Sequence, residues 1–166
     1  KTYLAMLAAI QAYRNKECER IILTRPAVGV DDEKHGFLPG DLNQKMEPWT
    51  KPMFDIFEQY FSYNQIDRFV KIEPLGYMRG RTFTDTLIIA DEMQNATPNQ
   101  MKMLLTRLGQ GSKMVVTGDL QQADRPSNNG LLEFLNLYND FSNHRYVDIC
   151  QFTADDIERH EAVKEI

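Results

Sequence analysis

The hydrophobic residues of this chain fall into short runs, some continuous and some alternating with polar residues, and the segments between them have the periodicity of amphipathic helices. The runs are bounded by Gly, Pro or charged residues and are short enough to be strands. They cover residues 20–24, 70–73, 87–90, 113–117 and 146–149. Because strands and helices alternate, we predict an α/β fold with a mostly parallel sheet and helices on both of its faces.

The clearest helix begins at Thr97, which takes the N-cap position ahead of Pro98 and has Gln100 in the capping-box position. Apolar residues follow at i, i+3, i+4 and i+7, and Gly109 predicts the end of this helix. The Gly- and Pro-rich residues 27–49 predict a long surface loop with a helical turn near 42–46. The other predicted helices are residues 2–16, buried on most sides, a helix capped by Thr50, residues 131–137, and a last helix capped by Thr153.

The composition is that of an ordinary globular protein, and the net charge makes broad, non-specific binding to nucleic acid less favourable. The 166 residues are 42% hydrophobic and 26% charged, which suits a single compact domain. The formal net charge of −5 argues against a broad basic surface, so any contact with nucleic acid must be local. No apolar run approaches bilayer length and no signal-peptide pattern opens the chain, so we expect a cytoplasmic location and no membrane partner.

Candidate chemistry lies where the predicted strands end. Asp91 and Glu92 directly follow a buried strand, and parallel strands deliver such residues to one edge of the sheet, where α/β proteins bind ligands. On its own, an Asp-Glu pair most simply opens a solvated loop. Lys1 and Thr2, however, stand at the head of a buried helix, as the last residues of a phosphate-binding loop G-x-x-x-x-G-K-[ST] do. Together these residues predict a site for a nucleotide, Mg²⁺ and an attacking water.

Several motifs resemble those of PhoH-like proteins, a branch of the P-loop NTPases with motifs similar to superfamily 1 helicases. The blocks Asp91-Glu92-Met93-Gln94-Asn95 and Tyr77-Met78-Arg79-Gly80-Arg81 are the most specific. The resemblance implies a single RecA-like P-loop NTPase domain over residues 1–166 that lacks its N-terminal strand and the glycine part of the P-loop. The motifs cover residues 24–27, 36–41, 74–82, 91–95, 97–103, 111–119 and 159–160.

The same resemblance implies a role for each residue of the predicted site, with ATP and Mg²⁺ as ligands. Lys1 would neutralise the β and γ phosphates, and the Thr2 hydroxyl would bind Mg²⁺. Asp91 would hold the same ion through water, because Mg²⁺ keeps much of its hydration shell. Glu92 would orient or deprotonate the attacking water.

Three further catalytic residues follow from the resemblance. Gln94 and Gln122 match the family's γ-phosphate sensors, although Gln122 could equally be a surface loop residue. Charge on the γ-phosphoryl group in the transition state calls for an arginine. The candidates are Arg25, Arg79, Arg81, Arg125 and Arg159. The resemblance favours Arg159, acting across a subunit interface, although an ordinary exposed helical arginine fits its position as well.

Nucleic acid is a possible partner of the loop that carries Tyr77, Arg79 and Arg81. A stacking ring beside phosphate-binding groups is typical of sequence-tolerant single-strand binders. The same arginines could instead contact nucleotide or a neighbouring subunit. The resemblance implies an ATPase that works as a homo-oligomer such as a hexameric ring, and this loop makes RNA or single-stranded nucleic acid a candidate partner of it. The alternative is a non-catalytic, nucleotide-responsive subunit that forms rings or binds nucleic acid.

Overall fold

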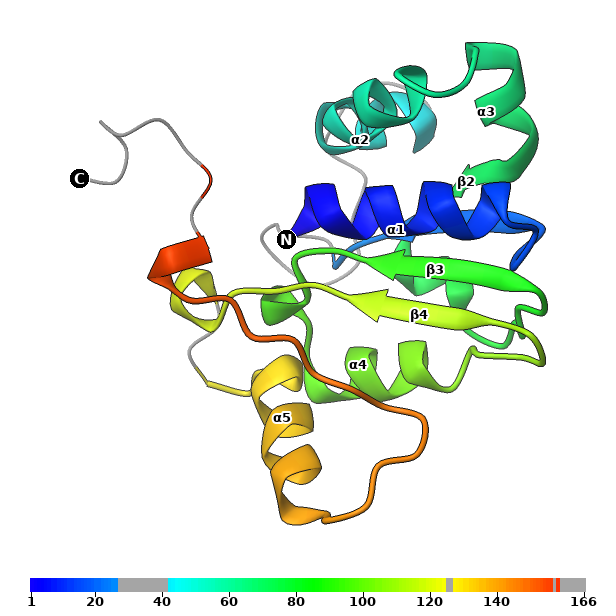
Figure 1. Cartoon of the computed structure of the whole chain (residues 1–166). Helices are drawn as coiled ribbons and strands as arrows, with labels where there is room; N and C mark the ends of the chain where they lie inside the picture. The colour runs from blue at the N-terminus through cyan, green and yellow to red at the C-terminus, as the bar shows by residue number, and fades with distance from the viewer. Residues whose placement is uncertain (27–41, 125–126, 157, 159–166) are drawn as a thin grey trace.

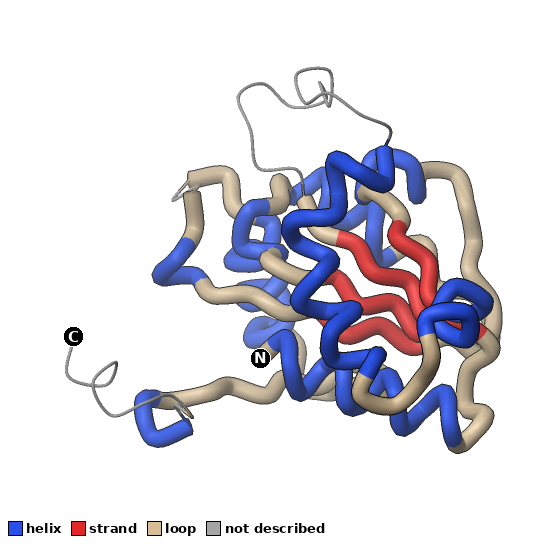
Figure 2. Tube along the Cα trace, turned by 90° about the horizontal axis from the view of Figure 1, so that it is seen from above, coloured by secondary structure: helices blue, strands red, loops and turns tan. Residues whose placement is uncertain are grey.

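Four parallel strands form the centre of the structure (Figures 1 and 2). The computed structural model describes residues 1–26, 42–124, 127–156 and 158. Within this part the strands lie in the order β2-β1-β3-β4, and every neighbouring pair is parallel. Their bounds are β1 Arg20–Thr24, β2 Val70–Ile72, β3 Thr86–Ala90 and β4 Lys113–Val116.

Helices cover both faces of the sheet. In Figure 1, α1, α2 and α3 lie above the sheet, whereas α4 and α5 lie below it. The helices are α1 Thr2–Arg14, α2 Leu42–Glu58, α3 Tyr63–Phe69, α4 Pro98–Leu105 and α5 Gly130–Asp140. Short 3₁₀ turns follow three of the strands: η2 Leu75–Met78 after β2, η3 Met93–Asn95 after β3 and η4 Leu120–Gln122 after β4. A further 3₁₀ turn, η5 Ala154–Asp156, follows α5.

The core consists of two layers, because successive residues of a strand point to opposite faces. Ile21, Leu23 and Ile89 pack on the side of α1, α2 and α3. Ile22 and Ile88 pack on the side of η2 and α4. The central strands β1 and β3 are thus buried on both faces, as their continuous apolar runs predict.

The predicted fold class is confirmed, and so are the four strands of the sheet. The Thr97 capping box is also present: Thr97 Oγ1 accepts from the Gln100 backbone N–H, and Gln100 Oε1 accepts from the Thr97 N–H at 2.9 Å. Cys18 and Cys150 are both free, the first buried and the second exposed.

The predicted helix start at Thr50 is wrong. The helix α2 begins at Leu42 and runs through Pro48 and Pro52. The reason is tertiary: Trp49 lies before the predicted start and packs against the core on the side of α1, so packing outweighs the local proline signal. The predicted surface loop is shorter as a result, and its residues 27–41 lie outside the described part.

The predicted strand at residues 146–149 is also wrong. These residues form no strand in the structure, and Tyr146 is 86% exposed. A strand needs a neighbour to satisfy its backbone groups, and these residues pair with none of the described strands. The alternation of apolar and polar residues was therefore not sufficient to predict pairing.

Three helix predictions need smaller corrections. The helix after Thr97 ends at Leu105 rather than at Gly109, because the Gly109 backbone N–H leaves the helix to donate to the Phe83 carbonyl at 2.7 Å. The first helix is less buried than predicted, since Tyr3 and Leu4 are exposed. After Thr153 the structure shows the 3₁₀ turn Ala154–Asp156, and most of the predicted last helix lies outside the described residues.

Candidate functional site

One buried carboxylate joins three segments at the carboxyl edge of the sheet. Thr2 Oγ1, at the start of α1, donates a 2.8 Å hydrogen bond to Asp91 Oδ1. Thr117 Oγ1, directly after β4, donates to the same oxygen. Asp91 itself follows β3 and is 6% exposed. Two hydroxyl groups therefore fix the orientation of this carboxylate, as the outer hydrogen bonds of a metal ligand do.

Lys1, the residue before Thr2, forms a charged pair with Asp119. Lys1 Nζ is 2.7 Å from Asp119 Oδ2, and both side chains are partly exposed. The hydrogen bond from Lys1 is the main cause that lowers the pKa of the Asp119 carboxyl, and the Gln121 backbone N–H adds to it. The ammonium group is thus held near the ends of β3 and β4 by a partner that a ligand phosphate could replace.

Glu92 has an unusual backbone and a fixed side chain. Its φ of 56° lies in the left-handed region, which costs a non-glycine residue about 1–3 kcal/mol. Its Oε2 accepts a hydrogen bond from Gln94 Nε2 at 2.5 Å. Gln94 is 1% exposed, and its Oε1 accepts from the Asp119 backbone N–H at 3.1 Å. This buried amide therefore links the carboxylate of Glu92 to the segment after β4.

Asn129 holds the backbone of Gln94 in place. Its Nδ2 donates to the Gln94 carbonyl at 2.6 Å, while its Oδ1 accepts from the backbone N–H groups of Leu131 and Leu132 as the N-cap of α5. Helix α5 and the turn that carries Glu92 are therefore joined through one side chain.

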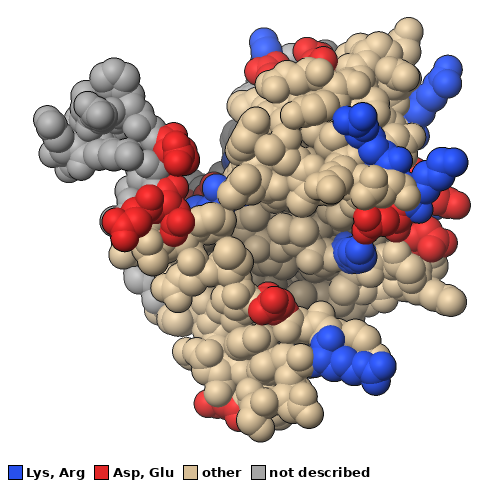
Figure 3. Space-filling model, in the orientation of Figure 1, with Lys and Arg blue, Asp and Glu red and all other residues tan. Residues whose placement is uncertain are grey.

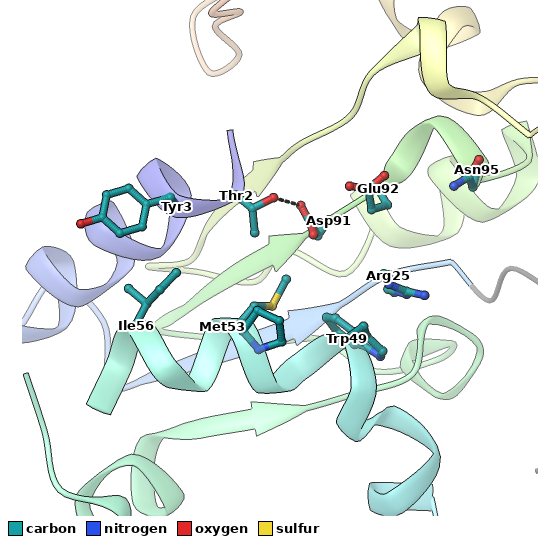
Figure 4. A pocket seen from close by; sticks show the side chains of 10 residues that line it. Thr2, Tyr3, Arg25, Trp49, Met53, Ile56, Asp91, Glu92 and Asn95 are labelled. Carbon is teal, nitrogen blue, oxygen red and sulfur yellow. Dashed lines mark hydrogen bonds between the residues drawn. The ribbon is translucent and has the colours of Figure 1, made fainter. Parts of the chain in front are cut away.

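A pocket of about 530 Å³ opens beside the two carboxylates, between α1, α2 and the ends of β1 and β3 (Figure 4). Arg25 lies within it, with its guanidinium carbon 5.1 Å from the centroid of the Trp49 ring. Burial lowers the pKa of Arg25, and the nearby carboxylates of Asp91 and Glu92 oppose that effect. The lining residues are Thr2, Tyr3, Arg25, Trp49, Pro52, Met53, Ile56, Asp91, Glu92 and Asn95.

The structure brings five of the predicted residues to this edge: Lys1, Thr2, Asp91, Glu92 and Gln94. Their roles toward ATP and Mg²⁺ stay predictions. Gln122 is exposed at the end of η4, and no hydrogen bond of its side chain is present among the described residues. Arg159 lies outside the described residues.

The predicted nucleic-acid residues lie away from the pocket. Tyr77 is exposed on η2, which packs against α4 on the opposite face of the sheet from α1. Arg81 forms a 2.8 Å ion pair with Glu73 and lies over the Phe83 ring. Arg79 is exposed. Their role in binding nucleic acid stays a prediction.

Sequence reasoning gave no role to Thr117, Asn129 or Trp49. Thr117 could have been found, because it is the last residue of a predicted strand whose carboxyl end lies at the same edge of the sheet as Asp91. The hydrogen bond from Asn129 to Gln94 spans 35 residues and has no local signal. Trp49 was missed because its helix was predicted to begin one residue after it.

Comparison with known proteins then gives the family. A family model described as PhoH-like protein matches residues 1–166. The chain belongs to the PhoH-like family. A PhoH-like protein of Synechocystis sp. is 45% identical over 173 residues, which cover 100% of this chain and 52% of that protein. Protein PhoH of Escherichia coli is 39% identical over 169 residues, 96% of this chain and 46% of that protein. The chain thus spans about half the length of these PhoH-like relatives.

The PhoH-like family has the P-loop NTPase fold, with which the parallel sheet agrees. The residues at the carboxyl edge also fit the chemistry of Mg²⁺, which takes one or two protein oxygens and keeps several waters. In the described part, no group of three or more His, Cys, Asp or Glu residues could hold a metal. The hydroxyl of Thr2 and the carboxylate of Asp91 suit an ion that keeps most of its water ligands.

No described helix is long and apolar enough to cross a membrane.

Proposed function

We propose that the domain binds ATP with Mg²⁺ and hydrolyses it at the carboxyl edge of the sheet. The observation that carries this proposal is the hydrogen bond of 2.8 Å between Thr2 Oγ1 and Asp91 Oδ1. It joins the two side chains that the P-loop and the strand-end acid contribute to a magnesium site in this fold. The family membership of the chain supports the same chemistry.

In this proposal each residue has a distinct task. Mg²⁺ supplies neutralisation of phosphate charge when it is bound. Lys1 exchanges Asp119 for the phosphates of ATP, because a phosphate offers the ammonium group more negative charge than one carboxylate. Glu92 accepts a proton from the attacking water, and Gln94 keeps its carboxylate in place. Gln94 is thus a positioning residue, since its own amide is buried behind Glu92.

The open edge of the sheet supports a further strand before α1. In the described part β4 has a neighbour on one side only, and Met114, Val115 and Val116 are half-buried where β1 and β3 are buried. An apolar edge of this kind is normally paired or covered. We infer that a strand and a G-x-x-x-x-G loop precede Lys1 in the parent protein. The upstream coding sequence tests this directly, and unrelated residues there would contradict it.

We also propose that hydrolysis is coupled to binding of RNA or single-stranded nucleic acid, and that the protein forms a homo-oligomeric ring. In that ring Arg159 would act as the arginine finger across a subunit interface. Figure 3 shows one face of the molecule, on which most Lys and Arg side chains gather along one side and have Asp and Glu side chains among them. On this face a nucleic acid would meet local contacts rather than a continuous basic patch, in keeping with the net charge of −5.

The role of Thr2 can be tested in the full-length parent protein. Thr2→Ala removes one proposed oxygen ligand of Mg²⁺, so we expect the Mg²⁺ concentration for half-maximal ATP hydrolysis to rise about tenfold or more. Thr2→Ser keeps the hydroxyl and should stay close to wild type. Thr106→Ala, a change at an exposed threonine after α4, serves as the control. An unchanged Mg²⁺ dependence of Thr2→Ala would remove Thr2 from its proposed role.

A further inference from the structure

Arg25 is a half-buried cation beside an aromatic ring. Its guanidinium group lies against the Trp49 ring, and among the described residues it makes no hydrogen bond or ion pair. A guanidinium group has five N–H donors in a fixed fork. Burial lowers the pKa of Arg25, because it disfavours the charged form. A fork of this kind, held against a flat ring, matches the oxygens of a carboxylate or a phosphate.

The pocket that contains Arg25 has two chemically different ends. In Figure 4, Arg25 lies beside Trp49 at the end of the pocket where Glu92 and Asn95 are found. Tyr3 and Ile56 lie at the other end, with Met53 between them and Trp49. A ligand that fits this arrangement has an anionic group at one end and a flat or apolar group at the other.

This pocket is distinct from the place where Lys1 would receive the β and γ phosphates. Lys1 and its partner Asp119 do not line the pocket. Thr2 and Asp91 do line it, so their hydrogen bond forms the boundary between the two regions. A volume of about 530 Å³ is also far larger than one phosphate group needs, and it lies in the range of sites for small ligands.

We propose that this pocket binds one nucleotide unit, with its phosphate on Arg25 beside Trp49 and its base at the opposite end, against Tyr3 and Ile56. The unit can come from a single strand or from a free nucleotide, since both offer the same phosphate and ring. Arg25 suits a phosphate because its fork matches two phosphate oxygens, and the Trp49 ring restricts the orientation of the guanidinium group.

Occupancy of this pocket acts on the proposed catalytic carboxylate. Arg25 is close enough to Asp91 and Glu92 for their charges to stabilise its protonated form. A phosphate on Arg25 adds negative charge near these carboxylates and so changes the charge balance beside Glu92. The effect on Glu92 rests on the proposed function, whereas binding in the pocket does not.

The fluorescence of Trp49 tests the inference, because Trp49 is the only tryptophan of these 166 residues. The full-length protein is titrated with a short single-stranded oligouridylate and, separately, with ATP without Mg²⁺. Trp49→Phe supplies the background to subtract. We expect a change in Trp49 emission on binding, and Arg25→Ala to weaken the affinity about tenfold to 100-fold. Arg25→Lys keeps the charge but not the fork and should weaken it less. Arg14→Ala, at an exposed arginine of α1, is the control.

The two ligands distinguish the source of the nucleotide unit. Dependence on Arg25 for the oligouridylate alone assigns the pocket to a strand, and dependence for ATP alone assigns it to a free nucleotide. Two outcomes overturn the inference: neither ligand changes Trp49 emission, or Arg25→Ala binds as tightly as wild type. Circular dichroism checks folding, and Arg25→Lys carries the comparison should Arg25→Ala fail to fold. Phosphate release with no Trp49 response contradicts this inference and leaves the proposed hydrolysis standing.

Discussion

Replacing Glu92 by Gln in the full-length protein should lower the rate of ATP hydrolysis about 10²-fold to 10⁴-fold while ATP still binds. The substitution removes the proton acceptor but keeps the shape of the side chain. An amide oxygen at this position can still accept the hydrogen bond from Gln94 Nε2, so the local structure should persist. Phosphate release measures the rate, and equilibrium binding of a fluorescent ATP analogue measures the affinity.

Glu133→Gln is the matched control, because Glu133 is an exposed glutamate in the first turn of α5. It should change neither quantity. If Glu92→Gln hydrolysed ATP at the rate of wild type, another group would have to accept the proton of the attacking water. Loss of binding together with hydrolysis would instead point to a structural role for Glu92, whose left-handed backbone is already strained.

Replacing Phe57 by Ala should lower the free energy of unfolding by about 3–5 kcal/mol. Phe57 is fully buried, and its ring lies 6.5 Å from Phe54 and 6.3 Å from Phe69. It connects α2 to α1 and to the end of α3 above the sheet. The loss would be a large part of the 5–15 kcal/mol by which most domains are stable. Urea unfolding followed by circular dichroism provides the measurement.

Tyr63→Ala is the control for this experiment, since Tyr63 is 67% exposed at the start of α3. An exposed aromatic residue of this kind should cost no more than about 0.5 kcal/mol. Equal losses for the two variants would contradict the packing of α2 on α1. Because α2 also carries Trp49, that result would in turn weaken the description of the pocket.

The sequence was most informative where a local pattern determines position. Asp91 and Glu92 follow an unbroken apolar run, and in a parallel sheet such a run can end only at the carboxyl edge. Lys1 and Thr2 stand at the head of a helix whose apolar residues must face the sheet. These two patterns were enough to predict that the four side chains share one edge, which the contact between Thr2 and Asp91 agrees with.

Contacts between distant segments could not be predicted in this way. The burial of Gln94 depends on Asn129 and on the backbone of Asp119, both more than 20 residues further along the chain. The position of Trp49 depends on how far α2 extends, which packing against α1 decides. Residues 146–149 show the opposite case. Their sequence has the pattern of a strand, but in the structure they are exposed and pair with none of the described strands.

The central claim is that the carboxyl edge around Asp91 hydrolyses ATP rather than only binding it. The most direct measurement is phosphate release from ATP by the full-length wild-type protein, with Mg²⁺ and with the ion removed by a chelator. The proposed function predicts steady release that needs Mg²⁺ and stops when the ion is removed. ATP binding without Mg²⁺-dependent phosphate release would contradict it and would favour a nucleotide-responsive subunit without turnover.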